Sequence, residues 1–158
     1  MELHRHSQSG QRPTANYTQV VITRALTTRL EDLAAALRKH AEGGLCAEAA
    51  VELLIEHRSW LSRGDFVRGF TELVNDMIGT PMAVVDWHGA VEALEAGRLA
   101  CSSSENQVLR LAASIAEGVP VDLGEALCAL DETNALAVAR ALMHAAGHGD
   151  LWIARACR

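Results

Sequence analysis

The chain has 158 residues, of which 49% are hydrophobic and 22% charged, and its formal net charge is −6. These values are ordinary for a single globular domain, and the negative charge disfavours a nucleic-acid-binding function, which needs a basic surface. No apolar run approaches the roughly 18 residues that a membrane-spanning helix requires, so the sequence predicts no membrane span.

Alanine, the best helix former, accounts for 27 residues, whereas aromatic residues make up only 4% of the chain. We therefore predict an all-α fold, a compact multi-helix bundle of about seven helices with no sheet. One lysine stands against thirteen arginines, which together with the alanine content indicates GC-rich codons and a bacterial gene. The polar first residues do not resemble a signal peptide, so we expect a cytoplasmic protein.

Residues 1–16 are polar and without periodicity, and we expect a disordered tail followed by one helical domain over residues 17–158. A helical pattern starts at Thr18 and ends before Gly43 and Gly44. Its apolar stripe consists of Ile22, Leu26, Leu30, Leu33 and Leu37. A second helix is predicted over residues 47–61, with Ala50, Leu53, Leu54, His57 and Leu61 on its apolar side.

A third helix is predicted over residues 66–78, after Asp65 as N-cap and before Gly79. Its stripe is the most regular of the chain: Phe66, Phe70, Leu73, Val74, Met77 and Ile78. The segment Met82–Val85 is the only strand candidate, and it is too short to form a sheet by itself.

Four further helix starts are marked by N-cap residues: Asp86, Ser102 (with Glu105 at capping-box spacing), Asp122 (with Glu125) and Asp131. We expect Leu123, Leu127 and Leu130 to be buried and the alanine-rich helix after Asp131 to be buried on most sides. That helix ends at Gly147, and a last short helix from Asp150, with Trp152, is expected to dock on the body.

Residues 85–95 and 121–131 share Asp, Ala and Leu positions at an offset of 36 residues. Such a period is typical of stacked helical-hairpin repeats. The similarity equally fits two unrelated helices that both begin at an aspartate, and the sequence leaves both interpretations open.

His144 and His148 are four residues apart, the spacing of a zinc-binding pair on a helix. Gly147 lies between them at the expected end of the helix, so we expect His148 to lie outside it and His144 to stabilise the negative helix end. We interpret His57 as a core histidine satisfied by one hydrogen bond, and the pair His88 and Glu92 matches no metal motif. The four cysteines, at positions 46, 101, 128 and 157, are expected to be buried and reduced.

No nucleophile, phosphate-loop or metal motif emerges, so we predict no catalytic residue, metal or cofactor and favour a non-enzymatic interaction or regulatory module. Glu48, Glu52 and Glu56 form a row that is either a solvated face or an acidic strip for a partner. Trp60, Phe66, Trp87 and Trp152 could anchor a protein partner if they are exposed, and self-association through an alanine-rich helix face is an alternative.

Two other functions remain open. A DNA-binding regulator would use the helices predicted at 47–61 and 66–78 as a helix-turn-helix, although its second helix is net acidic. A small enzyme or metal-binding bundle would need a pocket with ionisable side chains that the sequence does not reveal.

Overall fold

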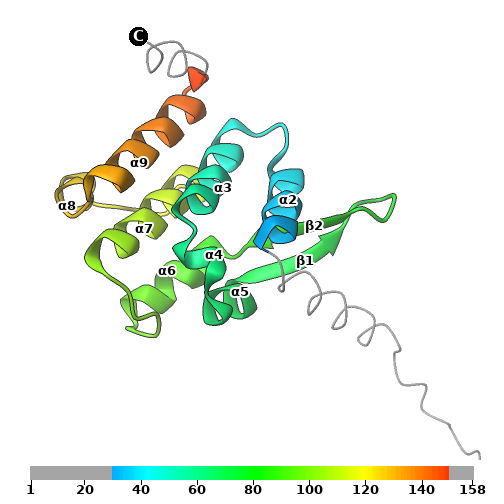
Figure 1. Ribbon diagram of the computed structural model, residues 1–158, viewed down its shortest axis with the longest axis horizontal. Coiled ribbons are helices and arrows are strands. Elements are labelled where there is room, and N and C mark those ends of the chain that lie inside the picture. The colour runs from blue at the N-terminus through cyan, green and yellow to red at the C-terminus, as the bar shows by residue number, and fades with distance from the viewer. Residues whose placement is uncertain (1–29, 150–158) are drawn as a thin grey trace, which may run out of the picture.

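The computed structural model describes residues 30–149, and this part of the chain is mainly helical with one two-stranded antiparallel sheet (Figure 1). The expectation of a fold without a sheet is therefore wrong, although the helical class is confirmed. The elements are α2 (Leu30–Ala41), α3 (Leu45–His57), α4 (Ser59–Ser62), α5 (Gly64–Phe70), β1 (Thr71–Asn75), β2 (Pro81–Val85), α6 (Trp87–Glu95), α7 (Ser103–Glu117), α8 (Leu123–Cys128) and α9 (Glu132–Ala145).

Helix α3 is the centre of the fold, because it packs against α7, α9 and α2 (Figure 1). Its Leu53 and Leu54 are fully buried, and the alanines Ala49 and Ala50 allow the neighbouring helices to approach closely. These residues belong to one continuous hydrophobic core that also contains Trp60 and Phe66. The amphipathic pattern of the sequence therefore predicted correctly which face of this helix is inside.

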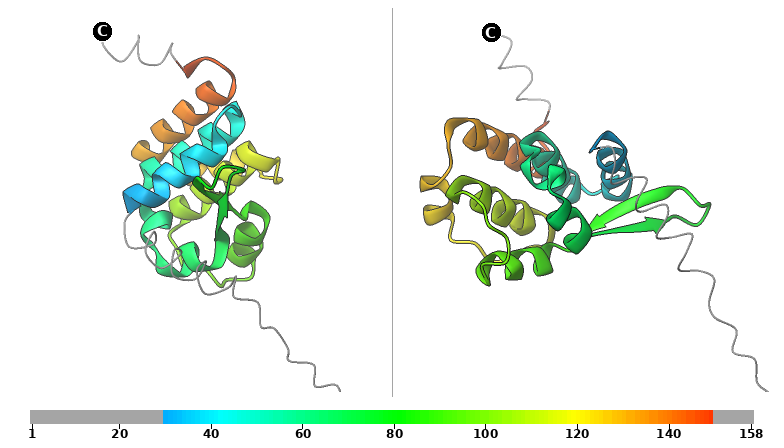
Figure 2. Two further views of the ribbon diagram at one scale, coloured as in Figure 1. Left: turned by 90° about the vertical axis from the view of Figure 1, so that its right-hand side faces the viewer. Right: turned by 60° about the horizontal axis from the view of Figure 1, so that its bottom comes forward.

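The hairpin of β1 and β2 projects from the helical body, as the right-hand view of Figure 2 shows. Its register pairs Leu73 with Ala83 and Val74 with Met82, and α2 packs against β2. The main-chain N–H of Asp86 donates to the carbonyl oxygen of Phe70 and closes the base of the hairpin. The hairpin is therefore anchored at its base and beside α2, while its turn extends beyond the helices.

The hairpin replaces most of the helix predicted over residues 66–78, because that helix ends at Phe70. From Thr71 onwards the chain forms strand β1, which pairs with Pro81–Val85. The predicted strand candidate Met82–Val85 is therefore part of a sheet, although it is too short to form one by itself. A local stripe cannot reveal this pairing partner. The helix-turn-helix arrangement also loses its second helix, since only two turns remain and Phe66 is buried.

The predicted helix starts are confirmed at four positions. The side chains of Asp86, Ser102, Asp122 and Asp131 each accept a hydrogen bond from the main-chain N–H three residues later. Ser102 and Glu105 form the complete reciprocal capping box. Asp65 is a correction: it lies in the first turn of α5, whose N-cap is Arg63.

The second half of the described chain is less buried than the sequence predicts. Leu123 and Leu127 of α8 are about half exposed, and so are Leu136 and Leu142 of α9. These helices lie at the edge of the body and not at its centre, so only one side of each is covered (Figure 1). Of the cysteines that the structure describes, Cys46 and Cys128 are exposed and Cys101 is half-buried, which corrects the expectation of buried thiols.

The segments 85–95 and 121–131 share their helix start but not their structural setting. Helix α6 follows a strand and buries five side chains, among them Trp87 and Val91, whereas α8 follows a helix and buries Ala126. Both helices have an Asp N-cap, Asp86 in α6 and Asp122 in α8. In the part of the chain that the structure describes, none of the helices combines the length and apolar character needed to cross a bilayer.

Candidate interaction surface

The turn of the hairpin, residues 76–80, is held in shape by the side chain of Asp76. Its carboxylate accepts hydrogen bonds from the main-chain N–H groups of Ile78 (2.9 Å) and Thr80 (2.7 Å). Gly79 has a φ of +88°, a conformation that residues with a side chain rarely adopt. Because the N–H of Thr80 stabilises the ionised carboxylate, the pKa of Asp76 is lowered. The turn is thus fixed by local bonds.

Two large apolar side chains extend from this turn into solvent. Met77 is 104% exposed and Ile78 is 89% exposed. Val74, Met82 and Val84, on the strand face opposite Leu73 and Ala83, are only partly covered. We call these five residues the hairpin tip patch. Single exposed apolar residues are common on proteins, but several apolar residues on one projecting element are typical of an interaction site.

The hairpin carries negative charge only. Residues 71–86 include Glu72, Asp76 and Asp86 and no lysine or arginine. A segment that touches phosphates needs basic side chains, so this hairpin is not suited to the DNA backbone. Apolar side chains between carboxylates instead fit a protein surface with an apolar depression and basic residues around it.

The acidic row of α3 is partly exposed to solvent and is also ion-paired within the chain. Each glutamate is paired within the chain: Glu48 with His144 at 2.9 Å, Glu52 with Arg38 at 2.8 Å, and Glu56 with Arg140. Arg38 belongs to α2, whereas Arg140 and His144 belong to α9. The row therefore connects α3 to α2 on one side and to α9 on the other.

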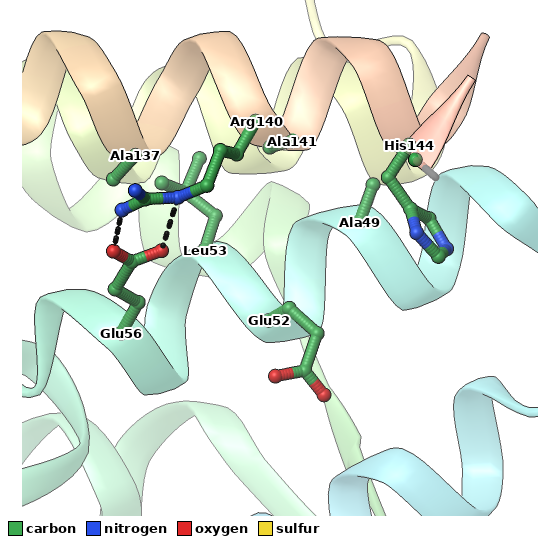
Figure 3. A pocket seen from close by; sticks show the side chains of 9 residues that line it. Ala49, Glu52, Leu53, Glu56, Ala137, Arg140, Ala141 and His144 are labelled. Carbon is green, nitrogen blue, oxygen red and sulfur yellow. Dashed lines mark hydrogen bonds and ion pairs between the residues drawn. The ribbon is translucent and has the colours of Figure 1, made fainter. Parts of the chain in front are cut away.

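Glu52 and Glu56 of the row border a shallow groove between α3 and α9, which Figure 3 shows from close by. Ala49, Leu53, Ala137 and Ala141 form its apolar floor, and the guanidinium group of Arg140 reaches across to Glu56. The groove has a volume of about 220 Å³. We call it the α3–α9 groove.

The tryptophans predicted as anchors are not available to a partner where the structure describes them. Trp60 and Phe66 are fully buried with their ring centroids 5.3 Å apart, and Trp87 lies in the same core. They contribute to the stability of the body. Trp152 lies outside the described residues.

The histidines do not assemble a metal centre within residues 30–149. No group of three or more His, Cys, Asp or Glu side chains there could hold an ion. His144 lies in the last turn of α9, as predicted, and His148 follows the end of that helix. His88 faces Glu117 at 3.6 Å on an exposed surface, not the predicted neighbour Glu92.

His57 differs from the expected core histidine, because its Nδ1 atom is buried and has no hydrogen-bond partner among residues 30–149. Burial lowers its pKa, whereas the charges of Glu105 and Asp131 oppose this effect. The nearby hydroxyl groups are occupied elsewhere: Ser59 donates to Glu105, and Ser104 donates to Asp131. This cluster connects α7 with α4 and α9 and includes no activated nucleophile.

Met77 and Ile78 are exposed, although the helical period predicts both on a buried stripe. The signal was present in the letters N-D-M-I-G-T-P, residues 75–81, in which Asn, Asp, Gly and Pro are typical of a turn. No protein-family model, curated protein or solved structure matches this chain.

Proposed function

We propose that the chain is a non-enzymatic protein-interaction module, of bacterial origin and cytoplasmic, whose docking element is the β1–β2 hairpin. The observation that carries the proposal is the full exposure of Met77 and Ile78 on a turn fixed by Asp76. A preorganised turn loses little conformational entropy on binding, so the burial of its apolar side chains contributes directly to affinity.

The partner is a protein with an apolar pocket surrounded by lysine or arginine side chains. Burial of one Met or Ile side chain contributes about 1.5–3 kcal/mol. The two together therefore supply about 3–6 kcal/mol, which corresponds to roughly 100- to 10,000-fold in the dissociation constant. The three carboxylates of residues 71–86 favour the basic surroundings and speed association at low salt.

Site-specific photocrosslinking in the source cells tests which molecule covers the patch. The photoreactive residue p-benzoylphenylalanine replaces Met77 in the full chain, and a control chain carries it at Glu132, which is exposed at the start of α9, far from the hairpin (Figure 1). We expect one protein of another sequence to crosslink from position 77 and not from position 132. Crosslinks to residues 1–29, to a second copy, or to nothing would each overturn the proposal.

Affinity measurements with that purified partner then test the mechanism. Met77→Asp and Ile78→Asp should each weaken binding by about 10- to 100-fold, the value of one buried side chain. Asp76→Ala keeps both apolar side chains but removes the bonds that fix the turn, so it should also weaken binding. Glu132→Gln should bind like the wild type. Equal affinities for all four variants would show that the hairpin is not the docking element.

A further inference from the structure

The floor of the α3–α9 groove is apolar, although its margins are ionic. Ala49, Ala137 and Ala141 are too small to fill the space between the two helices, and the result is a volume of about 220 Å³. A cavity of roughly 150 Å³ in an apolar protein interior holds benzene, so the groove has room for a larger aromatic ring.

Helix α9 ends beside this groove. Gly147, with a φ of +78°, ends the helix, and the main-chain N–H groups of Gly147 and His148 bond to the carbonyl oxygens of His144 and Met143. This pattern ends the helix sharply. Gly149 then forms part of the wall of the groove, together with His144.

The sequence that follows, D-L-W-I-A-R-A-C-R, supplies an aromatic ring within reach. Trp152 is three residues after Gly149, and three residues span at most about 10 Å. The floor runs along α9 from His144 to Ala137, which is about 10 Å at 1.5 Å per residue. Trp152 is therefore able to reach any point of the groove.

Charge favours the same segment. Residues 150–158 contain two arginines and one aspartate, and Glu52, which pairs with Arg38 but is half-exposed, lies in the groove wall. We infer that Trp152 of residues 150–158 occupies the α3–α9 groove and that Arg155 contacts the glutamate row. The groove is then an internal docking site, independent of the partner proposed for the hairpin.

Quenching of tryptophan fluorescence by iodide tests the occupancy in the full chain. Trp60 and Trp87 are buried, so any emission that iodide reaches belongs to Trp152. We expect the quenching constant of the wild type to lie within about twofold of that of Trp152→Phe. Quenching of roughly one third of the emission, the share of one tryptophan among three, would overturn the inference.

Chemical rescue tests the location. Trp152→Ala should melt at a lower temperature than the wild type, and added indole should restore the difference, because indole fills the emptied groove. Ile153→Ala is the matched control and should not respond to indole. If indole has no effect on Trp152→Ala, the ring of Trp152 does not occupy the α3–α9 groove, and the inference is wrong.

A third measurement distinguishes this chain from a second copy as the source of the ring. The shielding of Trp152 from iodide should be independent of protein concentration from about 0.1 to 100 µM. A loss of shielding on dilution would assign the groove to a neighbouring molecule and overturn the internal docking. Ala137→Leu, which fills the floor, should expose Trp152, and shielding that persists in this variant would also contradict the proposal.

Discussion

The indole N–H of Trp60 donates a hydrogen bond of 3.1 Å to the main-chain carbonyl oxygen of Glu105, 45 residues away in the sequence. Trp60 belongs to α4, and Glu105 lies in the first turn of α7. The same glutamate accepts a hydrogen bond from Ser59 and completes the capping box of α7. This contact therefore joins the core to the start of a long helix.

Trp60→Phe should destabilise the fold because it keeps an aromatic ring but removes the indole N–H that donates to the carbonyl oxygen of Glu105. One such hydrogen bond contributes about 0.5–1.5 kcal/mol. Trp60→Ala should cost more, about 3–5 kcal/mol, because it also creates a cavity. Urea denaturation measures both free energies of unfolding. A Trp60→Phe variant as stable as the wild type would show that the hydrogen bond contributes nothing.

The pair of Glu56 and Arg140 should contribute only modestly to stability, although it connects α3 with α9. Both side chains are about 40% exposed, and exposed ion pairs are worth roughly 0.2–1 kcal/mol. A double-mutant cycle with Glu56→Gln and Arg140→Met measures the coupling energy. The pair Glu95 and Arg110, which is similarly placed at the surface, is the matched comparison. A coupling above about 2 kcal/mol would mean that the pair is effectively desolvated.

Glu48 should make stability depend on pH in the acid range. The main-chain N–H of Gly43 and, to a lesser degree, His144 hold its pKa below the ordinary value of 4.5. A carboxyl group whose pKa is lowered by folding stabilises the protein above its unfolded pKa, and this contribution is lost as pH falls through the folded pKa. The difference between wild type and Glu48→Gln should therefore be full above pH 4.5 and should vanish in stronger acid.

The relative size of the two causes gives a control for this pH dependence. The Gly43 bond is the larger cause of the lowered pKa of Glu48. The pH-dependent stability difference caused by Glu48→Gln should therefore be mostly retained when it is measured in a His144→Gln protein. Denaturant midpoints measured between pH 2 and 7 provide the comparison. If His144→Gln abolishes the pH dependence, the histidine and not the main chain stabilises the carboxylate.

Arg58→Gly should stabilise the protein. Arg58 separates α3 from α4 with φ 61° and ψ −34°, and it is the only non-glycine residue with a positive φ among residues 30–149. Relief of such strain gains about 1–3 kcal/mol, and the added flexibility of glycine offsets about 0.5–1 kcal/mol of this. We expect a net gain of about 1 kcal/mol in thermal denaturation.

Gly118→Ala is the opposite change and serves as the control for Arg58→Gly. Gly118 ends α7 in the left-handed conformation with a φ of 71°, and a Cβ atom there would meet no neighbour within 4 Å. Any loss of stability is therefore due to the backbone alone and should be about 1 kcal/mol. If both substitutions change stability in the same direction, strain at Arg58 is not the cause.

The features that depend only on residues close together in the sequence could be predicted from it. The caps at Ser102 and Asp131 and the helix end at Gly147 are made by bonds that span three to five residues, so the letters alone specify them. The buried stripe of α3 follows in the same way from the 3.6-residue period of a helix.

The hairpin and the pairing of the glutamate row depended on contacts between distant segments. The stripe from Phe66 to Ile78 has the helical period, yet Thr71–Asn75 pairs with Pro81–Val85 because α2 covers β2 and completes the buried face. Likewise, the sequence does not reveal the pairing partners of Glu48 and Glu56, because His144 and Arg140 come beside them only through the packing of α9 on α3. Periodicity determines which side of a segment is apolar, but only packing in three dimensions decides which partner covers that side and whether Met77 and Ile78 stay exposed.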